Sequence, residues 1–181
     1  MILQFRSRLS LLIILLLSAP FTGCAESNTQ SGNATPKVGY VTNGIASFWV
    51  IAEKGAMDGG TEFNADVNVQ MPANGVEDQK RMCQDLLAQG IDGIAISPID
   101  PGNQGDLLAE ISQHTKLITQ DSDAPDSDRL CYIGVDNYTA GRMCGALVKE
   151  AMPEGGSVII FVGRLGQANA RLRRQGVIDE L

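Results

Sequence analysis

The sequence predicts an α/β fold in which helices cover both faces of an open parallel sheet. Short apolar runs alternate along the chain with segments whose apolar residues recur at helical spacing, which is the order of strands and helices in a parallel sheet. The apolar runs are nearly continuous, as expected of strands that are buried on both faces. Helices are therefore needed on both sides, and right-handed crossovers are expected between the strands.

The predicted strands are the short apolar segments themselves. They comprise residues 37–42, 67–71, 93–97, 116–120, 131–135 and 157–162. The sequence has no internal repeat of the solenoid kind. We therefore expect these segments to pair in an open sheet rather than in a repeating array.

Helix starts are recognisable between several of these strands. Asn74 followed by Glu77 fits a capping box, and Asp100 places a capping side chain before a proline at the first helical position. Asp136 is predicted to cap a later helix in the same way. The helix after Pro101 is predicted to bury Leu107, Leu108 and Ile111. The apolar face of the later helix is predicted to comprise Ala140, Met143, Cys144, Leu147, Val148 and Ala151.

The N-terminus is interpreted as an export signal. Arg6 and Arg8 precede an apolar run over residues 9–19, which is too short to span a bilayer but fits a secretory signal core. The small residues that lead into Cys24 resemble a bacterial lipobox. In lipoproteins of that type the peptide is cut before the cysteine, which then carries lipid. The resemblance implies a signal peptide over residues 1–23; cleavage of an ordinary signal, with Cys24 incidental, is the alternative.

Residues 24–36 are predicted to be a flexible tether. They are nearly all small or polar, so they cannot bury enough apolar area to offset the entropy of ordering. The remaining residues, 37–181, are enough for one ordinary domain and part of a second. The chain stops at Leu181 inside a segment with a helical pattern, so we interpret the sequence as a truncated product or fragment.

Charge and cysteine spacing argue against several classes of partner. The net charge is −7, without a basic run before the folded part, so a nucleic-acid partner is not expected. The cysteines beyond the lipobox, Cys83, Cys131 and Cys144, lack metal-site spacing, and no metal or other cofactor is expected. Cys83 and Cys131 are predicted to be buried thiols. A disulfide between Cys131 and Cys144 is the alternative in an oxidising compartment.

An enzyme is not the expected function. The sequence has no Ser-His-Asp set with a plausible nucleophile elbow and no phosphate-binding glycine pattern after the first strand. His114 is the single histidine, and it falls in the last turn of a predicted helix, where a partial positive charge complements the helix dipole. We therefore predict a binding protein.

Polar and aromatic residues follow the predicted strands, where an open α/β sheet binds its ligands. Asn43, Phe48 and Trp49 come after the first strand, Ser97 ends the third, and Asp121 follows the fourth. Sugar hydroxyls need hydrogen-bond donors and acceptors, and the C–H face of a sugar stacks on an aromatic ring. These segments therefore predict a site for a polyol at the carboxyl edge of the sheet.

The order of these motifs resembles that of the ribose-binding-protein family. The motifs are Tyr-Val-Thr-Asn before Ser-Phe-Trp, Gly-Ile-Asp-Gly-Ile-Ala-Ile-Ser-Pro, Ile-Thr-Gln-Asp-Ser-Asp-Ala, Ile-Gly-Val-Asp-Asn-Tyr-Thr-Ala-Gly-Arg and Gly-Arg-Leu-Gly-Gln-Ala-Asn-Ala-Arg. That family comprises periplasmic type I solute-binding proteins, in which two α/β lobes joined by a hinge close around one sugar. The resemblance implies a first lobe over residues 37–135, an incomplete second lobe over residues 136–181, and a hinge at Val135 and Asp136.

The resemblance also implies particular contacts with a ligand. The implied ligand-binding residues are Asn43, Phe48, Trp49, Ser97, Asp121, Ser122 and Arg171. Ser122 stands where ribose binders carry arginine, which argues against ribose itself. Structural roles stay open for three of these residues: core packing for Trp49, turn formation for Asp121, and a solvated helix face for Arg171.

The function implied by the resemblance is that of a substrate-binding lipoprotein of an ABC-type sugar transporter. Its partners would be a monosaccharide or related polyol, a membrane permease, and the membrane itself through the lipid anchor, in the periplasm or at the cell surface. An extracytoplasmic ligand sensor for a signalling partner is the alternative, and a carbohydrate-active enzyme is less favoured. With the second lobe incomplete, we expect this chain alone to bind sugar weakly or not at all.

Overall fold

The structure is a computed structural model that describes residues 34–181. The predicted signal peptide, Cys24 and most of the predicted tether lie outside the described residues. Within the described part of the chain, no helix is both long enough and apolar enough to cross a membrane.

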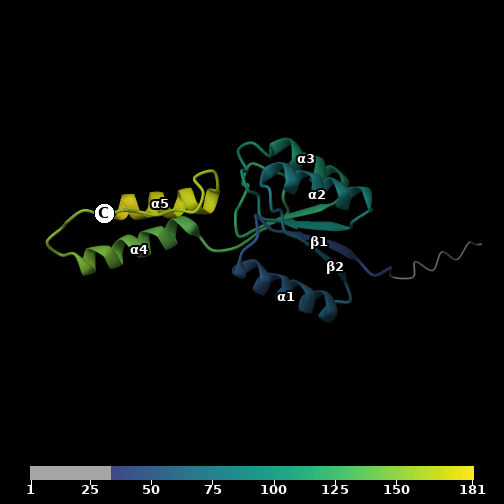
Figure 1. The fold of residues 1–181 in the computed structure, drawn as a ribbon, viewed down its shortest axis with the longest axis horizontal. Coiled ribbons are helices and arrows are strands. Elements are labelled where there is room, and N and C mark those ends of the chain that lie inside the picture. The colour runs from purple at the N-terminus through teal and green to yellow at the C-terminus, as the bar shows by residue number, and fades with distance from the viewer. Residues whose placement is uncertain (1–33) are drawn as a thin grey trace, which may run out of the picture. The chain divides into compact units, whose positions relative to one another are not determined.

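A five-stranded parallel sheet forms the centre of the described fold (Figure 1). Its strands are β1 (Lys37–Val41), β2 (Asp66–Gln70), β3 (Gly93–Ile96), β4 (Lys116–Gln120) and β5 (Tyr132–Ile133). They lie in the order β2-β1-β3-β4-β5, and every pairing is parallel, which confirms the predicted fold class. The order reverses between β1 and β3, and such a switch point is where open α/β sheets bind their ligands.

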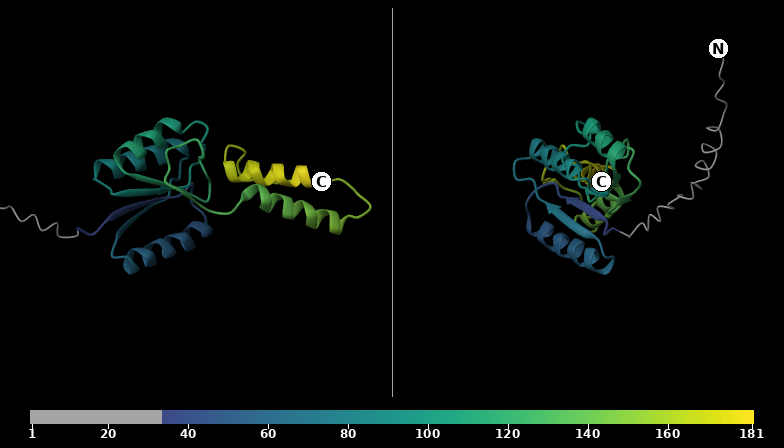
Figure 2. Two further views of the ribbon diagram at one scale, coloured as in Figure 1. Left: turned by 180° about the vertical axis from the view of Figure 1, so that it is seen from behind. Right: turned by 90° about the vertical axis from the view of Figure 1, so that its right-hand side faces the viewer.

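Helices cover both faces of this sheet, as predicted. Helix α1 (Ser47–Glu62) lies on one face, whereas α2 (Val76–Ala88) and α3 (Gly105–His114) lie on the other (Figure 2). The core lies between the sheet and the α2–α3 layer and comprises Val41, Cys83, Leu86, Ile94, Ile96, Leu107, Leu108, Ile111, Leu117 and Ala124. The predicted burial of Leu107, Leu108 and Ile111 is therefore confirmed.

Helices α4 (Asn137–Ala151) and α5 (Ala168–Glu180) lie side by side (Figure 1). Their backbones approach at glycines: a Cβ atom added to Gly141 would lie 2.2 Å from the carbonyl oxygen of Arg173. A Cβ added to Gly176 would lie 2.2 Å from the carbonyl oxygen of Tyr138. Only glycine permits so close an approach of two backbones.

The predicted strand at residues 157–162 does not form. This segment is neither strand nor helix, and Phe161 within it is 91% exposed. A strand is stable only when a neighbouring strand accepts and donates its backbone hydrogen bonds, and no strand among residues 34–181 pairs with it. The predicted strand at residues 131–135 is also shorter in the structure, where only Tyr132–Ile133 pair.

Two of the three predicted helix caps are wrong. Helix α2 begins after Gly75, whose φ of 83° places it in the left-handed region, and the carboxylate of Asp78 accepts from the backbone N–H groups of Ala73 and Asn74 at 3.0 and 3.3 Å. Asp100 precedes a turn rather than α3, which begins after Gln104. The predicted cap at Asp136 is confirmed, because its carboxylate accepts from the backbone N–H of Thr139 at 3.0 Å.

The predicted apolar face of α4 is wrong. Met143 is 66% exposed and Leu147 is also exposed, whereas Gly141 and Gly145 are buried. The glycines let the α5 backbone approach the helix on their side, so the larger side chains point to solvent. Apolar spacing alone could not reveal a contact made by residues without side chains.

The cysteines are partly as predicted. Cys83 is buried, and burial raises the pKa of its thiol to about 12. Cys131, predicted to be buried, is exposed and precedes β5. Cys144 is exposed, and neither it nor Cys131 forms a disulfide.

Candidate functional site

A cluster of polar side chains lies at the carboxyl edge of the sheet. Asn43 follows β1, Ser97 follows β3 and Asp121 follows β4. The side-chain amide of Asn43 donates to Ser97 Oγ at 3.1 Å and to Asp121 Oδ2 at 3.2 Å, and Ser97 Oγ donates to Asp121 Oδ2 at 3.1 Å. The structure thus brings together three residues that the sequence predicted for one site, because neighbouring parallel strands end at the same edge.

Two aromatic rings from the first turn of α1 adjoin this cluster. Trp49 is only 4% exposed, and its indole N–H donates to Asn43 Oδ1 at 3.1 Å. Phe48 is 57% exposed, and its ring centre lies 4.9 Å from that of Trp49 in an edge-on arrangement. Trp49 therefore packs in the fold and orients the amide of Asn43, as the core-packing alternative required, whereas Phe48 presents a ring that a ligand can reach.

Asp121 has an uncommon backbone conformation. Its φ of 59° is left-handed, which few residues other than glycine adopt, although aspartate tolerates it better than most. Its backbone N–H donates to the carbonyl oxygen of Ile133 at 3.0 Å. The side-chain hydrogen bonds that it receives from described residues all end on Oδ2, including one from Asn169 in α5 at 3.2 Å. Its Oδ1 is therefore the oxygen available to a ligand.

A cavity of about 530 Å³ lies next to this carboxylate. It is lined by Tyr40, Phe48, Ala95, Ile118, Gln120, Asp121, Ile133, Gly134, Val135 and Arg173. The hydroxyl of Tyr40 donates to Gln120 Oε1 at 3.1 Å. Burial, and to a lesser extent the Asp121 carboxylate, raises the pKa of Tyr40 above its ordinary value, so this hydroxyl stays neutral and keeps its proton.

Sequence reasoning missed Tyr40 and Gln120 as residues of this region. Both lie inside strands, β1 and β4, that were predicted from their continuous apolar character, and this pattern does not mark polar positions within a strand. The available signal was their type, because tyrosine and glutamine within a buried strand need hydrogen-bond partners.

Neither Arg171 nor Ser122 makes a side-chain hydrogen bond to the cluster. Arg171 donates to the carbonyl oxygen of Gly166 at 2.5 Å and lines a different cavity, of about 480 Å³. Asn169 and Arg173, by contrast, are one helical turn apart and share the side of α5 that faces Asp121 or the cavity beside it. Ser122 is fully buried, and its Oγ has no hydrogen-bond partner among the described residues.

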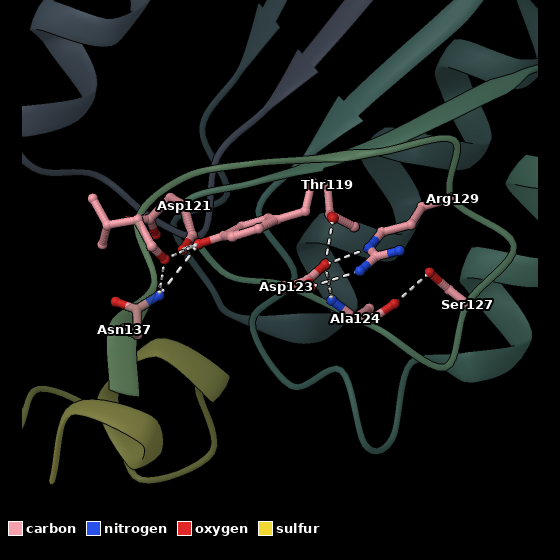
Figure 3. Close-up of polar contacts among 9 residues, drawn as sticks. Thr119, Asp121, Asp123, Ala124, Ser127, Arg129 and Asn137 are labelled. Carbon is pink, nitrogen blue, oxygen red and sulfur yellow. Dashed lines mark hydrogen bonds and ion pairs between the residues drawn. The ribbon is translucent and has the colours of Figure 1, made fainter. Parts of the chain in front are cut away.

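An ion pair organises the loop that follows Asp121 (Figure 3). Arg129 donates to both carboxylate oxygens of Asp123, at 2.5 and 2.8 Å, and the hydroxyl of Thr119 donates to Asp123 Oδ1 at 2.6 Å. Burial alone would raise the pKa of Asp123, but the hydrogen bonds from Arg129, Thr119 and the Ala124 backbone hold it below its ordinary value. The carboxylate is thus ionised, and its hydrogen bonds hold the loop together.

The predicted hinge residues connect β5 with α4. Val135 is exposed, and Asp136 is the N-cap of α4. The hydrogen bonds that Asp136 accepts from the backbone and the hydroxyl of Thr139 lower the pKa of its carboxyl group. Within residues 34–181, no cluster of histidine, cysteine, aspartate or glutamate is arranged to hold a metal ion.

A parallel sheet in this strand order, with a polar cluster at its carboxyl edge, defines an open α/β binding fold. A family profile described as the periplasmic binding protein domain matches residues 38–181. The chain therefore belongs to the periplasmic binding protein family.

Curated relatives agree with this assignment. The chain is 26% identical to the ribose import binding protein of Haemophilus influenzae over 162 residues, which cover 89% of this chain and 55% of the relative. It is 24% identical to the D-allose-binding periplasmic protein of Escherichia coli over 143 residues, which cover 73% of this chain and 46% of the relative. The chain thus spans about half the length of the curated relatives that it matches.

Solved structures show the same fold. One is an ABC transporter solute-binding protein from Burkholderia graminis in complex with D-arabinose, with 29% identity and a TM-score of 0.77 over 81% of this chain and 51% of that one. Another is a glucose-galactose binding protein from Geobacillus stearothermophilus, with 27% identity and a TM-score of 0.76 over 81% of this chain and 54% of that one. The described residues therefore have the fold of a type I periplasmic binding protein, as predicted.

Proposed function

We propose that this chain is the sugar-binding part of a substrate-binding lipoprotein for an ABC-type transporter, and that its ligand is a monosaccharide or related polyol. The observation on which the proposal depends is the convergence of Asn43, Ser97 and Asp121 beside the exposed ring of Phe48. The printed names of the relatives, which include binding proteins for ribose and D-allose, support a sugar as the ligand. They also support binding rather than catalysis.

The cluster supplies the chemistry that a sugar requires. A carboxylate accepts hydrogen bonds from two neighbouring hydroxyl groups, and such charge-assisted bonds are stronger than neutral ones. Asn43 and Ser97 hold Oδ2 of Asp121, so Oδ1 is presented to the ligand in a fixed orientation. Phe48 offers a face on which the C–H side of a sugar ring can stack. The departure from the family pattern at Ser122 argues against ribose itself.

In the proposed protein, two lobes close around the ligand. Residues 37–135 form the first lobe, residues 136–181 begin the second, and Val135 and Asp136 form the hinge of a closing motion. Asn169 donates to Asp121 from the second lobe, and the contact of Arg171 with the ligand stays a prediction from the family resemblance. The N-terminal signal and a lipidated Cys24 would hold the protein at the membrane, in the periplasm or at the cell surface, beside its permease.

Trp49 provides a direct test. It is the single tryptophan of the chain and donates to Asn43, so its fluorescence reports on the cluster. In a full-length protein that contains both lobes, we expect one class of pentose, hexose or polyol to change the emission in a saturable way. The Asp121→Ala variant should lose about 2 kcal/mol or more of binding free energy, because sugar hydroxyls would lack their acceptor.

Asp58→Ala is the matched control, because it removes an exposed carboxylate from the same lobe, on α1. It should leave the titration unchanged. The proposal is overturned if no sugar shifts the fluorescence, or the NMR signals of the Trp49 indole and the Asn43 amide, in a full-length protein with both lobes that circular dichroism shows to be folded.

A further inference from the structure

The hydroxyl of Tyr132 lies between the carboxylate residue of the site and the start of α4. It is 2.9 Å from the carbonyl oxygen of Asp121 and 3.3 Å from that of Val135. The side-chain amide of Asn137 donates to this hydroxyl at 3.2 Å and to the carbonyl oxygen of Val135 at 3.1 Å. Figure 3 shows these bonds joining Asp121, which follows β4, with Asn137, the first residue of α4.

Counting protons assigns a direction to each bond. The tyrosine hydroxyl has one proton, and the amide of Asn137 has two. Asn137 can satisfy both the Tyr132 oxygen and the Val135 carbonyl, so the tyrosine proton is free for the closer acceptor, Asp121. Burial, with the Asp121 carboxylate as a lesser cause, raises the pKa of Tyr132 above its ordinary value, so the phenol keeps this proton at neutral pH.

A glycine allows the ring to lie in this place. A Cβ atom added to Gly134 would lie 2.1 Å from the hydroxyl oxygen of Tyr132 and 2.4 Å from its ring carbon Cζ. Any other residue at this position would displace the ring. The position of the tyrosine hydroxyl therefore depends on the backbone of the segment that leads into α4.

The acceptor of the tyrosine proton is a residue with an uncommon, left-handed backbone conformation. Asp121 and Asn64 are the only non-glycine residues among residues 34–181 with positive φ. Strained conformations of this kind persist only where surrounding contacts hold them. For Asp121 these backbone contacts are the bond from its N–H to Ile133 and the bond from Tyr132 to its carbonyl.

We infer that Tyr132 is a positioning residue that couples the sugar-binding carboxylate of Asp121 to the conformation of residues 134–137. The inference rests on the proposed function, because it assumes that Asp121 binds the ligand. A change in the conformation of residues 134–137 would break the hydrogen bonds of Asn137 and Val135 with the Tyr132 hydroxyl. The hydrogen bond from this hydroxyl to the carbonyl oxygen of Asp121 would then be altered as well. By linkage, a ligand that holds Asp121 in its present conformation favours the present conformation of residues 134–137.

The first test needs no ligand. Tyr132→Phe removes the hydroxyl and keeps the ring. It should shift the NMR signals of the Asn43 side-chain amide and the Trp49 indole, because both belong to the hydrogen-bond chain that ends on Asp121. Tyr138→Phe is the matched control, since it removes an exposed hydroxyl whose partner is Asp179, and it should leave those signals in place. Unchanged signals in a folded Tyr132→Phe chain would overturn the inference.

The second test uses the sugar identified by fluorescence. Tyr132→Phe should weaken binding about fivefold, as expected for one lost hydrogen bond, and should abolish the sugar-induced slowing of amide hydrogen exchange at residues 135–137. A wild-type full-length protein with both lobes that binds no sugar contradicts the proposed function, whereas a wild-type protein that binds and a variant that keeps the slowing contradict only the inference.

Gly134→Ala gives an independent route to the same result. It displaces the tyrosine without removing its hydroxyl, so it should reproduce the shifts at Asn43 and Trp49 that Tyr132→Phe produces. This variant also serves if Tyr132→Phe unfolds. A Gly134→Ala chain that is folded and shows wild-type signals would count against the coupling.

Discussion

The sheet region and the α4–α5 pair are held together in different ways. The sheet packs against α2 and α3 through fully buried aliphatic side chains such as Leu86, Ile94 and Ile111. Helices α4 and α5 meet through glycine backbones, and Glu180 accepts from Arg142 and Lys149 at 2.6 and 2.9 Å while Met143 points to solvent. The stability of one region therefore depends on apolar volume, and that of the other on close backbone approach at glycines and on ion pairs.

The largest expected effect lies in the sheet region. Leu86→Ala should reduce the free energy of unfolding by about 2–5 kcal/mol, because it removes a buried side chain and leaves a cavity. Urea denaturation followed by circular dichroism measures this loss. Ile51→Ala is the control, since Ile51 is exposed on α1, and it should change the free energy by less than about 0.5 kcal/mol. Equal effects of the two variants would show that the aliphatic core is not what stabilises the sheet.

A smaller effect is expected in the α4–α5 pair. Gly141→Ala should destabilise the packing of the two helices by about 1–3 kcal/mol, because the added methyl group overlaps the backbone of Arg173. Hydrogen exchange should then become faster in α4 and α5 and stay unchanged in β1 and β3. Gly55→Ala is the matched control, since a Cβ there meets open space, and it should be neutral or stabilising. Faster exchange throughout the sheet would show that the two regions unfold together.

The Asp123–Arg129 ion pair gives the smallest effect and depends on pH. The pKa of Asp123 is lower in the folded chain than its ordinary value. The ionised carboxylate therefore stabilises the folded chain at pH values above that ordinary pKa of about 4. This stabilisation is lost as the pH falls through the folded pKa. Arg129→Met should cost about 1 kcal/mol at neutral pH, and the difference from wild type should shrink as the solution is acidified. A difference that is the same in acid and at neutral pH would rule out the carboxylate as its source.

Sequence patterns predicted the sheet region better than the α4–α5 pair for a physical reason. Parallel strands reveal themselves by continuous apolar character, and their shared edge brings Asn43, Ser97 and Asp121 together without further information. The contacts of Gly141 and Gly176 are made by the backbone, so they leave no apolar pattern in the sequence from which they could be predicted. The expected strand at residues 157–162 does not form, because an apolar segment becomes a strand only where a neighbouring strand supplies its backbone hydrogen bonds.

Local competition explains the remaining differences around the site. Asn74 had the right type for a cap, but Asp78 and not Glu77 accepts from the backbone N–H of Asn74, and the helix begins one residue later, after Gly75. Arg171 matched the family pattern, yet the rotation of a helix places Asn169 and not its neighbour two residues later beside Asp121. Such outcomes depend on tertiary geometry that residue type does not specify.

The side chain of Asn43 has both of its ends in use. Its oxygen accepts from the indole of Trp49, and its nitrogen donates to Ser97 and Asp121. Aspartate has the same shape, but it would replace the donating N–H with a second negative oxygen facing Asp121. Keeping two neighbouring carboxylates ionised at that separation costs free energy, because their negative charges repel. Deamidation of Asn43, which converts its amide group to a carboxylate, would therefore favour the binding of a proton by this cluster.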